Sequence, residues 1–147
     1  MSSTYSFLDV TASLVGPGGA ISLGSGAGAA EEGISVDPTE EINTMTVGAD
    51  GSGMHTLHAN KSGRVTVRLL KTSPTNGLLS AMYAFQTAGS LTHGQNTLMI
   101  NDVARGEIIA CRQVAFAKAP AVQYGKDAGV MEWDFNAVLI DRVLSST

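Results

Sequence analysis

The chain has 147 residues and a mass of 15.2 kDa, which fits one domain that folds without a disulfide or metal. Its net charge of −4 argues against nucleic-acid binding through phosphates, which requires clustered lysine and arginine. No apolar run approaches the ~18 residues of a membrane span, no secretory signal is visible, and a single cysteine, Cys111, excludes an internal disulfide and favours a reducing compartment.

The first predicted element is a half-buried strand over residues 5–15, where apolar and polar side chains alternate. Its apolar face comprises Leu8, Val10, Ala12 and Leu14. The glycine and proline residues at 16–19 predict a tight turn, and residues 20–23 predict a short return strand. Residues 24–33 are small and rich in glycine, so we expect a loop that orders only when something packs on it.

Strands are also predicted at 34–37, 42–47 and 54–58, with the glycine-rich turn 48–53 between the last two. The strongest strand pattern is 64–71. There Val65, Val67 and Leu69 share one face, whereas Arg64, Thr66 and Arg68 share the other.

One helix is predicted, over about residues 74–88, because side chains recur there at helical spacing. The recurring residues are Leu78, Leu79, Met82, Tyr83, Phe85 and Gln86. Ser73 is the expected N-cap, Pro74 the first helical residue, and Gly89 a candidate end.

Three later strands are predicted at 96–102, 107–118 and 130–144. In the second, one parity comprises Ile108, Ala110, Arg112, Val114 and Phe116; in the third, it comprises Met131, Trp133, Phe135 and Ala137. Beyond Ala137 the pattern does not distinguish strand from helix. The whole predicts a single domain of β-rich α+β class, an antiparallel β-barrel or sandwich with one flanking helix. The open strand edges of such a fold are sticky unless covered or paired with another copy.

Charges are divided unevenly along the chain. Residues 1–60 contain seven acidic residues and no lysine or arginine, whereas residues 61–147 have a net charge of +3. Chance is one explanation for such a split in so few charges. The functional explanation is that oppositely charged surfaces attract copies head to tail, which generates rings or filaments.

No motif indicates an enzyme or a cofactor site. Residues 24–29 loosely fit a dinucleotide fingerprint, but Gly33 and Pro38 leave no room for the helix it requires. His55 and His58, near Asp50, are three residues apart on a strand and therefore point to opposite faces. His93 and Cys111 are distant from them, so we expect no metal site, and an inert buried thiol at Cys111.

Two other groups of residues have equally plain explanations. The acidic pairs Glu31-Glu32 and Glu40-Glu41 lie in loop-like sequence, where carboxylates are usually solvated. Phe116, Trp133 and Phe135 are expected in the core, because basic residues do not interleave with them as a base-stacking surface requires.

Several segments together resemble the bacteriophage tail tube protein family, the inner-tube component of long-tailed and especially contractile-tailed phages. The segments are YSFLDVTASLVGPGGAISLGSGAGAAEEGI (5–34), TVGADGSGMHTLHANKSGRVTVRLLKTSPTN (46–76), LSAMYAFQ (79–86), Gln95-Asn96, RGEIIACRQVAFAKAP (105–120) and Glu132-Trp133-x-Phe135. The resemblance extends over nearly the whole chain.

This resemblance implies a structural virion protein without catalytic residues, cofactor or metal. Six copies would form a ring, and stacked rings would form the hollow tube that conducts the genome. The implied partners are further copies, the sheath, the baseplate and the tail terminator. DNA would pass without specific binding, no membrane would be involved, and the tail would assemble in the bacterial cytoplasm. The alternatives are a ring protein similar to Hcp of type VI secretion and, from a different class, a small-ligand-binding β-barrel.

The charge division adds a hypothesis about contacts between copies. We expect acidic residues from the first 60 positions to meet basic residues of an adjoining copy. The acidic candidates are Glu31, Glu32, Glu40, Glu41 and Asp50, and the basic candidates are Lys61, Arg64, Arg68 and Lys71.

Overall fold

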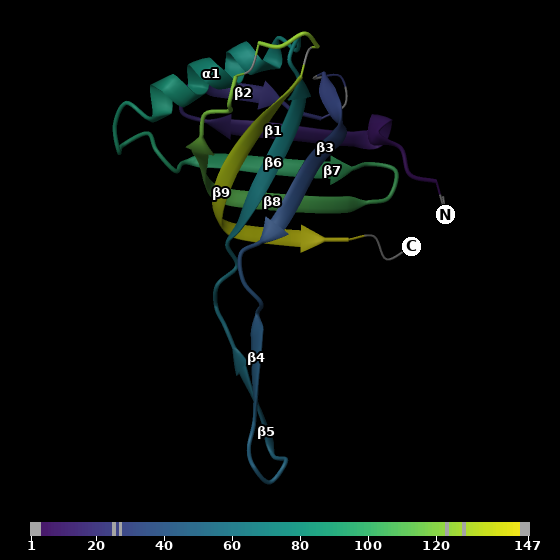
Figure 1. The fold of residues 1–147 in the computed structure, drawn as a ribbon, viewed down its shortest axis with the longest axis vertical. Helices are drawn as coiled ribbons and strands as arrows, with labels where there is room; N and C mark the ends of the chain where they lie inside the picture. Colours follow the sequence, from purple (N-terminus) through teal and green to yellow (C-terminus); the bar gives the residue numbers. More distant parts are fainter. Residues whose placement is uncertain (1–3, 25, 27, 123, 128, 145–147) are drawn as a thin grey trace.

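The computed structural model describes residues 4–24, 26, 28–122, 124–127 and 129–144, with only the backbone at 29–32 (Figure 1). A short 3-10 helix, η1 (Phe7–Asp9), precedes the first strand. The strands are β1 (Val10–Gly16), β2 (Gly19–Ser22), β3 (Ala29–Pro38), β4 (Asn43–Val47), β5 (Gly53–Leu57), β6 (Gly63–Leu70), β7 (Asn96–Asp102), β8 (Glu107–Lys118) and β9 (Val130–Val143). One α-helix, α1 (Thr75–Gln86), is present among the described residues, as predicted.

Seven of the strands form one antiparallel sheet in the order β2-β1-β7-β8-β9-β6-β3. The sheet folds over itself, so that β3 and β6 cross in front of β7 and β8, and the long curved strand β9 belongs to both layers (Figure 1). The predicted β-rich α+β class is confirmed. Of the two predicted forms, the sandwich is the better description, because β2 and β3 remain separate edges and the sheet does not close into a barrel.

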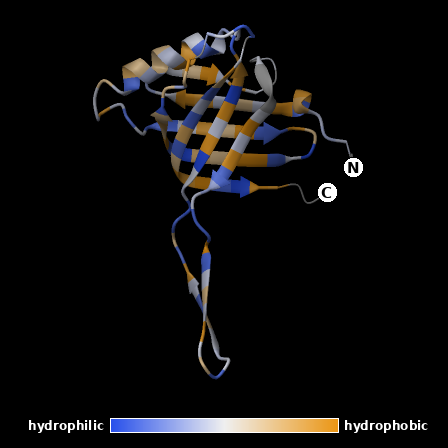
Figure 2. Ribbon diagram, in the orientation of Figure 1, coloured by the Kyte–Doolittle hydropathy of each residue, from blue (hydrophilic) through white to orange (hydrophobic). Residues whose placement is uncertain are grey.

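The core lies between the two layers of the folded sheet. Apolar residues alternate with polar ones along the strands (Figure 2), and the inward faces supply Leu14, Val67, Leu98 and Cys111, all 0% exposed. The three aromatic residues expected in the core lie there. The ring of Phe116 is 4.8 Å from that of Phe135 and 6.0 Å from that of Trp133, measured between centroids.

Helix α1 covers one end of this sandwich (Figure 1). It buries Leu79, Met82 and Gln86, and the indole Nε1 of Trp133 donates to Asn76 Oδ1 at 3.0 Å. The cap residue is Pro74, one position later than expected, although Ser73 Oγ still accepts from the Thr75 N–H at 3.2 Å. None of the described helices is long and apolar enough to cross a membrane.

The starts of strands β1 and β3 differ from the positions predicted from the sequence. The first strand starts at Val10 rather than residue 5, because residues 7–9 form η1, and Leu8 is 81% exposed instead of lying on the core face. The expected loop 24–33 is strand from Ala29 onward, whereas Ser25 and Ala27 lie outside the described residues. Backbone hydrogen bonding to β6 produces this strand despite the small side chains, and the register shifts between Ala29 and Ile34.

The predicted single parity of residues 107–118 is wrong. Cys111 is buried, and so are Val114 and Phe116, which have the other parity. Gln113 causes the change, because its φ of 53° places an extra residue in β8 as a bulge opposite β7, between the pairs Leu98–Cys111 and Asn96–Val114. After Ala137 the chain continues as strand to Val143, which settles the open choice between strand and helix.

Candidate assembly surfaces

The most conspicuous surface is a β-hairpin that projects away from the sandwich (Figure 1). We call residues 42–58 the arm; it contains β4, β5 and the turn between them. Every residue of β4 and β5 is exposed, and no arm residue belongs to the core cluster. An isolated two-stranded ribbon is marginally stable in water, so an uncovered arm of this kind gains stability from a partner.

The register of the arm gives its two faces different chemistry. Met45, Val47 and Leu57 lie on one face, and their exposed fractions are 61%, 57% and 80%. Thr44, Thr46 and Thr56 lie on the other face together with Met54. The sequence strand signals at 42–47 and 54–58 therefore combine into one ribbon with an apolar face exposed to solvent.

The tip of the arm is held by local hydrogen bonds. Asp50 Oδ1 accepts from the Ser52 N–H at 3.0 Å, and the Gly48 N–H donates to the Ser52 carbonyl at 2.7 Å. The hydrogen bond from Ser52 lowers the pKa of Asp50 below its usual value. Gly51 adopts a φ of 89°, a conformation that favours glycine and explains the glycine at this position of the turn.

The two arm histidines bind to neighbouring side chains on opposite faces of the ribbon. His55 Nδ1 lies 3.2 Å from Asn43 Nδ2, and His58 Nε2 lies 2.6 Å from Thr44 Oγ1. Among the described residues, no cluster of three or more histidine, cysteine, aspartate or glutamate side chains is placed to hold a metal ion.

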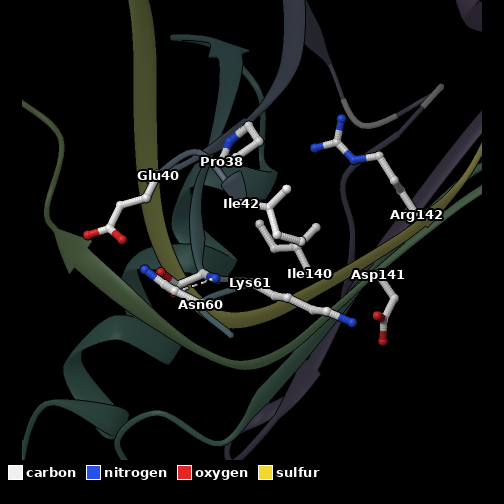
Figure 3. A pocket seen from close by; sticks show the side chains of 9 residues that line it. Pro38, Glu40, Ile42, Asn60, Lys61, Ile140, Asp141 and Arg142 are labelled. Atoms are coloured by element: carbon white, nitrogen blue, oxygen red, sulfur yellow. Dashed lines mark hydrogen bonds between the residues drawn. The ribbon is translucent and has the colours of Figure 1, made fainter. Parts of the chain in front are cut away.

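A hollow of about 510 Å³ marks the base of the arm (Figure 3). The side chains of Ile42 and Ile140 point toward one another at its centre, while Glu40 and Arg142 lie on opposite sides. Lys61 extends toward Asp141, and the Lys61 carbonyl accepts from the Ile140 N–H at 2.9 Å. Ile42 at the base of the arm therefore faces Ile140 of β9, and Lys61, just after the arm, hydrogen-bonds to β9, whereas none of the described arm residues is part of the core.

A second surface is the unpaired edge of β3. Beside it, an open hollow of about 390 Å³ is lined by β3, β7 and β8, where the sandwich is not closed. Asp102 contributes to this lining and is 6% exposed. Its Oδ2 atom has no hydrogen-bond partner among the described residues. A free strand edge next to an unsatisfied buried acceptor is suited to contact with another chain.

A third surface is a groove between α1 and β2, with a volume of about 410 Å³. Leu78, Ala81 and Phe85 form an outward stripe on α1 at intervals of three and four residues, separate from the buried face. Leu78 and Phe85 are 58% and 53% exposed. The remaining lining residues are Gly18, Gly19, Ala20, Ile21 and Met82.

The predicted contact residues lie on different parts of the molecule. The backbone of Glu31 and Glu32 belongs to the edge strand β3, and their side chains lie outside the described atoms. The other positions are Glu40 and Glu41 before the arm, Asp50 at its tip, Lys61 after it, Arg64 and Arg68 on β6, and Lys71 just beyond β6. Glu40 and Lys61 are brought together, around the hollow at the arm base.

Two of the basic candidates have partners within the same copy. Arg68 Nη1 donates to Ser35 Oγ at 2.8 Å, and its Nε lies 3.7 Å from Glu132. Lys71 Nζ lies 4.0 Å from the centroid of the Tyr124 ring. These contacts reduce the availability of both residues for a neighbouring copy.

The apolar side chains exposed on the arm and the exposed stripe on α1 were not among the residues predicted from the sequence to make contacts. The sequence contains a pattern that corresponds to each of these two surfaces. The segment 42–58 contains one charged residue, Asp50, and Leu78 and Phe85 are spaced by seven positions, two turns of a helix. Neither pattern shows that the side chains are exposed, because the same spacings occur in buried strands and helices.

Comparisons with known proteins identify the family of this chain and show which solved structures share its fold. Residues 1–145 match the family described as bacteriophage PhiTE tail tube protein. No protein with a curated description matches the sequence.

Solved structures with similar folds come from contractile injection systems. The PVC sheath-tube complex of an extracellular contractile injection system in its extended state contains a chain with a TM-score of 0.60 and 12% identity, covering 98% of this chain and 94% of that chain. A chain of the anti-feeding prophage cap (AFP tube terminating cap) has a TM-score of 0.56 and 12% identity, with coverage of 99% and 95%. A chain of the PVC sheath/tube terminator in its extended state has a TM-score of 0.52 and 14% identity, covering 97% of this chain and 99% of that chain.

Proposed function

Because the chain belongs to the bacteriophage PhiTE tail tube protein family, we propose that its copies form hexameric rings that stack into a tail tube conducting the genome during ejection. Family membership makes the chain a structural component of the virion tail and not an enzyme. The ring size, the passage of DNA and assembly in the host cytoplasm belong to the proposal.

The projecting arm is the observation that supports assembly most directly. An uncovered ribbon that exposes Met45, Val47, Met54 and Leu57 is costly for a solitary molecule, because apolar surface of this extent favours burial. The rest of the fold does not cover it (Figure 1). Contact between copies would bury the exposed apolar side chains against apolar surface of the neighbour. It would also stabilise the two-stranded ribbon, which is marginally stable alone.

Lateral contact within a ring is assigned to the edges of the open sheet. β3 offers ten residues of strand whose outer edge has no neighbour in the sheet. Adding a strand of a neighbouring copy satisfies backbone donors and acceptors there, and repeating this step around an axis closes a ring.

The same assembly implies a central channel for DNA and partner proteins around the tube. A net charge of −4 per copy suits a channel for DNA, because like charge keeps the phosphates from adhering. The sheath, the baseplate and a terminator are the proposed partners. Similar folds occur in a sheath-tube complex, a tube-terminating cap and a sheath/tube terminator of injection systems, which supports the sheath and the terminator as partners; the baseplate follows from the proposed tail alone.

The experiment is to purify the chain and follow its association by sedimentation velocity and negative-stain microscopy over a range of concentrations and salt. We expect annular particles with sixfold symmetry, and tubes at higher concentration. Solitary compact particles under every condition would refute the assembly, and rings of another symmetry would refute the hexamer alone. A ligand-binding barrel would remain monomeric throughout.

A further inference from the structure

We propose that the apolar face of the arm of one copy docks into the groove between α1 and β2 of a neighbouring copy, an inference that rests on the proposed stacking. The groove is the receptor, and Leu57 and Met45 are the inserted side chains. The contact is head to tail, so each copy uses its arm toward one neighbour and its groove toward another.

The arm and the groove match in chemistry. The arm face formed by Met45, Val47 and Leu57 also carries Asn43 and His55, which hydrogen-bond to each other, and it has no aspartate, glutamate, lysine or arginine, because Asp50 lies at the tip in the turn. The groove lining is made entirely of glycine, alanine, isoleucine, leucine, methionine and phenylalanine. Contact between the two surfaces therefore removes apolar area from water without desolvating a charge on either side.

The two surfaces also match in form. The groove has a floor of nearly buried side chains, Ile21 at 7% and Met82 at 3% exposure, and a wall in which Leu78 and Phe85 remain more than half exposed. Its volume of about 410 Å³ accommodates a few aliphatic side chains. A narrow ribbon with side chains on alternate positions fits beside a helix in such a groove.

The positions of the two surfaces favour a stacking contact. The arm projects from one end of the molecule, and α1 with β2 covers the opposite end (Figure 1). When copies are placed in a row with the same orientation, the arm of each points to the helix end of the next. A head-to-tail contact that does not close continues along an axis, as tube growth requires.

Paired cysteines test this contact directly. In the Leu57→Cys/Phe85→Cys chain, disulfides between copies are expected to give a ladder of dimers, trimers and higher species on a non-reducing gel. Each single variant has one new thiol and stops at dimers. The native Cys111 is 0% exposed and does not contribute. Both substituted residues are more than half exposed, so the core is left intact.

The matched control is Leu57→Cys/Val143→Cys, because Val143 is also exposed, at 65%, and lies at the end of β9 away from the groove. A ladder restricted to the Phe85 pair supports the docking. Tubes in the microscope without a ladder, or an equal ladder with Val143, would overturn the docking and leave the tube intact. Absence of tubes from the unsubstituted chain would instead refute the assembly on which the docking rests.

Discussion

At the scale of single residues, a buried pair of amides fastens α1 to the sheet. Gln86 Nε2 donates to Asn96 Oδ1 at 2.7 Å and to the Pro17 carbonyl at 2.8 Å, and Asn96 Nδ2 donates to Gln86 Oε1 at 2.6 Å. Both side chains are 1% exposed. Gly16 completes the arrangement, because a Cβ there would overlap the Asn96 amide. This network fixes the end of the sandwich that carries the groove.

We expect Gln86→Ala to lower the free energy of unfolding by about 2–4 kcal/mol, because it leaves the buried Asn96 amide without its partner and removes the hydrogen bond to the part-buried Pro17 carbonyl. Urea unfolding followed by Trp133 fluorescence measures the change. The control is Gln95→Ala, whose exposed side chain bonds only to the nearby Leu91 carbonyl and should cost under about 0.5 kcal/mol. Equal effects of the two substitutions would contradict the assigned role of the pair.

The thiol of Cys111 makes a pH-dependent contribution. Burial raises the pKa of Cys111 from 9.0 to about 11 in the folded chain. The unfolded state therefore loses its proton first, so stability from this group is complete below pH 9 and is lost as the pH rises to about 11. We expect a loss of about 2–3 kcal/mol over that range relative to Cys111→Ala. Parallel urea curves for the two proteins from pH 8 to 11 would disprove this.

At the scale of elements, the arm is separable from the body. Its residues lie outside the core cluster, and it is joined to β9 only at its base among the described contacts. Replacing residues 43–57 by a short glycine-serine linker is therefore expected to change the melting temperature by only a few degrees while abolishing tubes. Circular dichroism and negative-stain microscopy measure the two outcomes. Normal tubes from the armless chain would exclude the arm from assembly.

The bulge in β8 depends on a strained backbone. Gln113 holds a φ of 53°, which a β-branched residue adopts only with strain. We expect Gln113→Val to cost about 1–2 kcal/mol and Gln113→Gly to cost nothing or to stabilise slightly. Thermal unfolding provides the comparison, with Thr97→Val on the neighbouring strand as the control for added β-branching. A neutral Gln113→Val would show that the bulge tolerates any residue.

At the scale of the whole molecule, the charge division makes a prediction about association. The ion pairs found among the described side chains, Arg68–Glu132, Arg105–Glu107 and Arg112–Asp141, all lie within residues 61–147. If acidic residues of the first 60 positions meet a neighbouring copy, Glu31→Lys/Glu32→Lys should raise the concentration needed for tube growth and change its dependence on salt. Light scattering at several salt concentrations measures both. Unaltered growth would count against this contact, and Asp127→Lys is the control in the basic half.

Much of the fold is readable from local patterns. The alternation at Val10–Leu14, Val65–Leu69 and Met131–Ala137 identified core faces correctly, because side-chain direction along a strand depends only on the local backbone. The turn at 16–19, the glycine-rich turn of the arm and the helix also depend on neighbours in sequence.

The remaining features depend on partners distant in sequence. Strand β3 extends back to Ala29 because β6 pairs with it, and the parity of β8 changes at Gln113, where the register with β7 shifts. The alternation and turn patterns indicated the class of the fold, and composition showed the absence of clustered basic residues. Only the folded chain decides that the sheet stays open, that the arm projects alone, and that Leu78 and Phe85 face outward. Exposure and pairing are properties of neighbours in space, and a local pattern of residues is the same whether those neighbours are present or not.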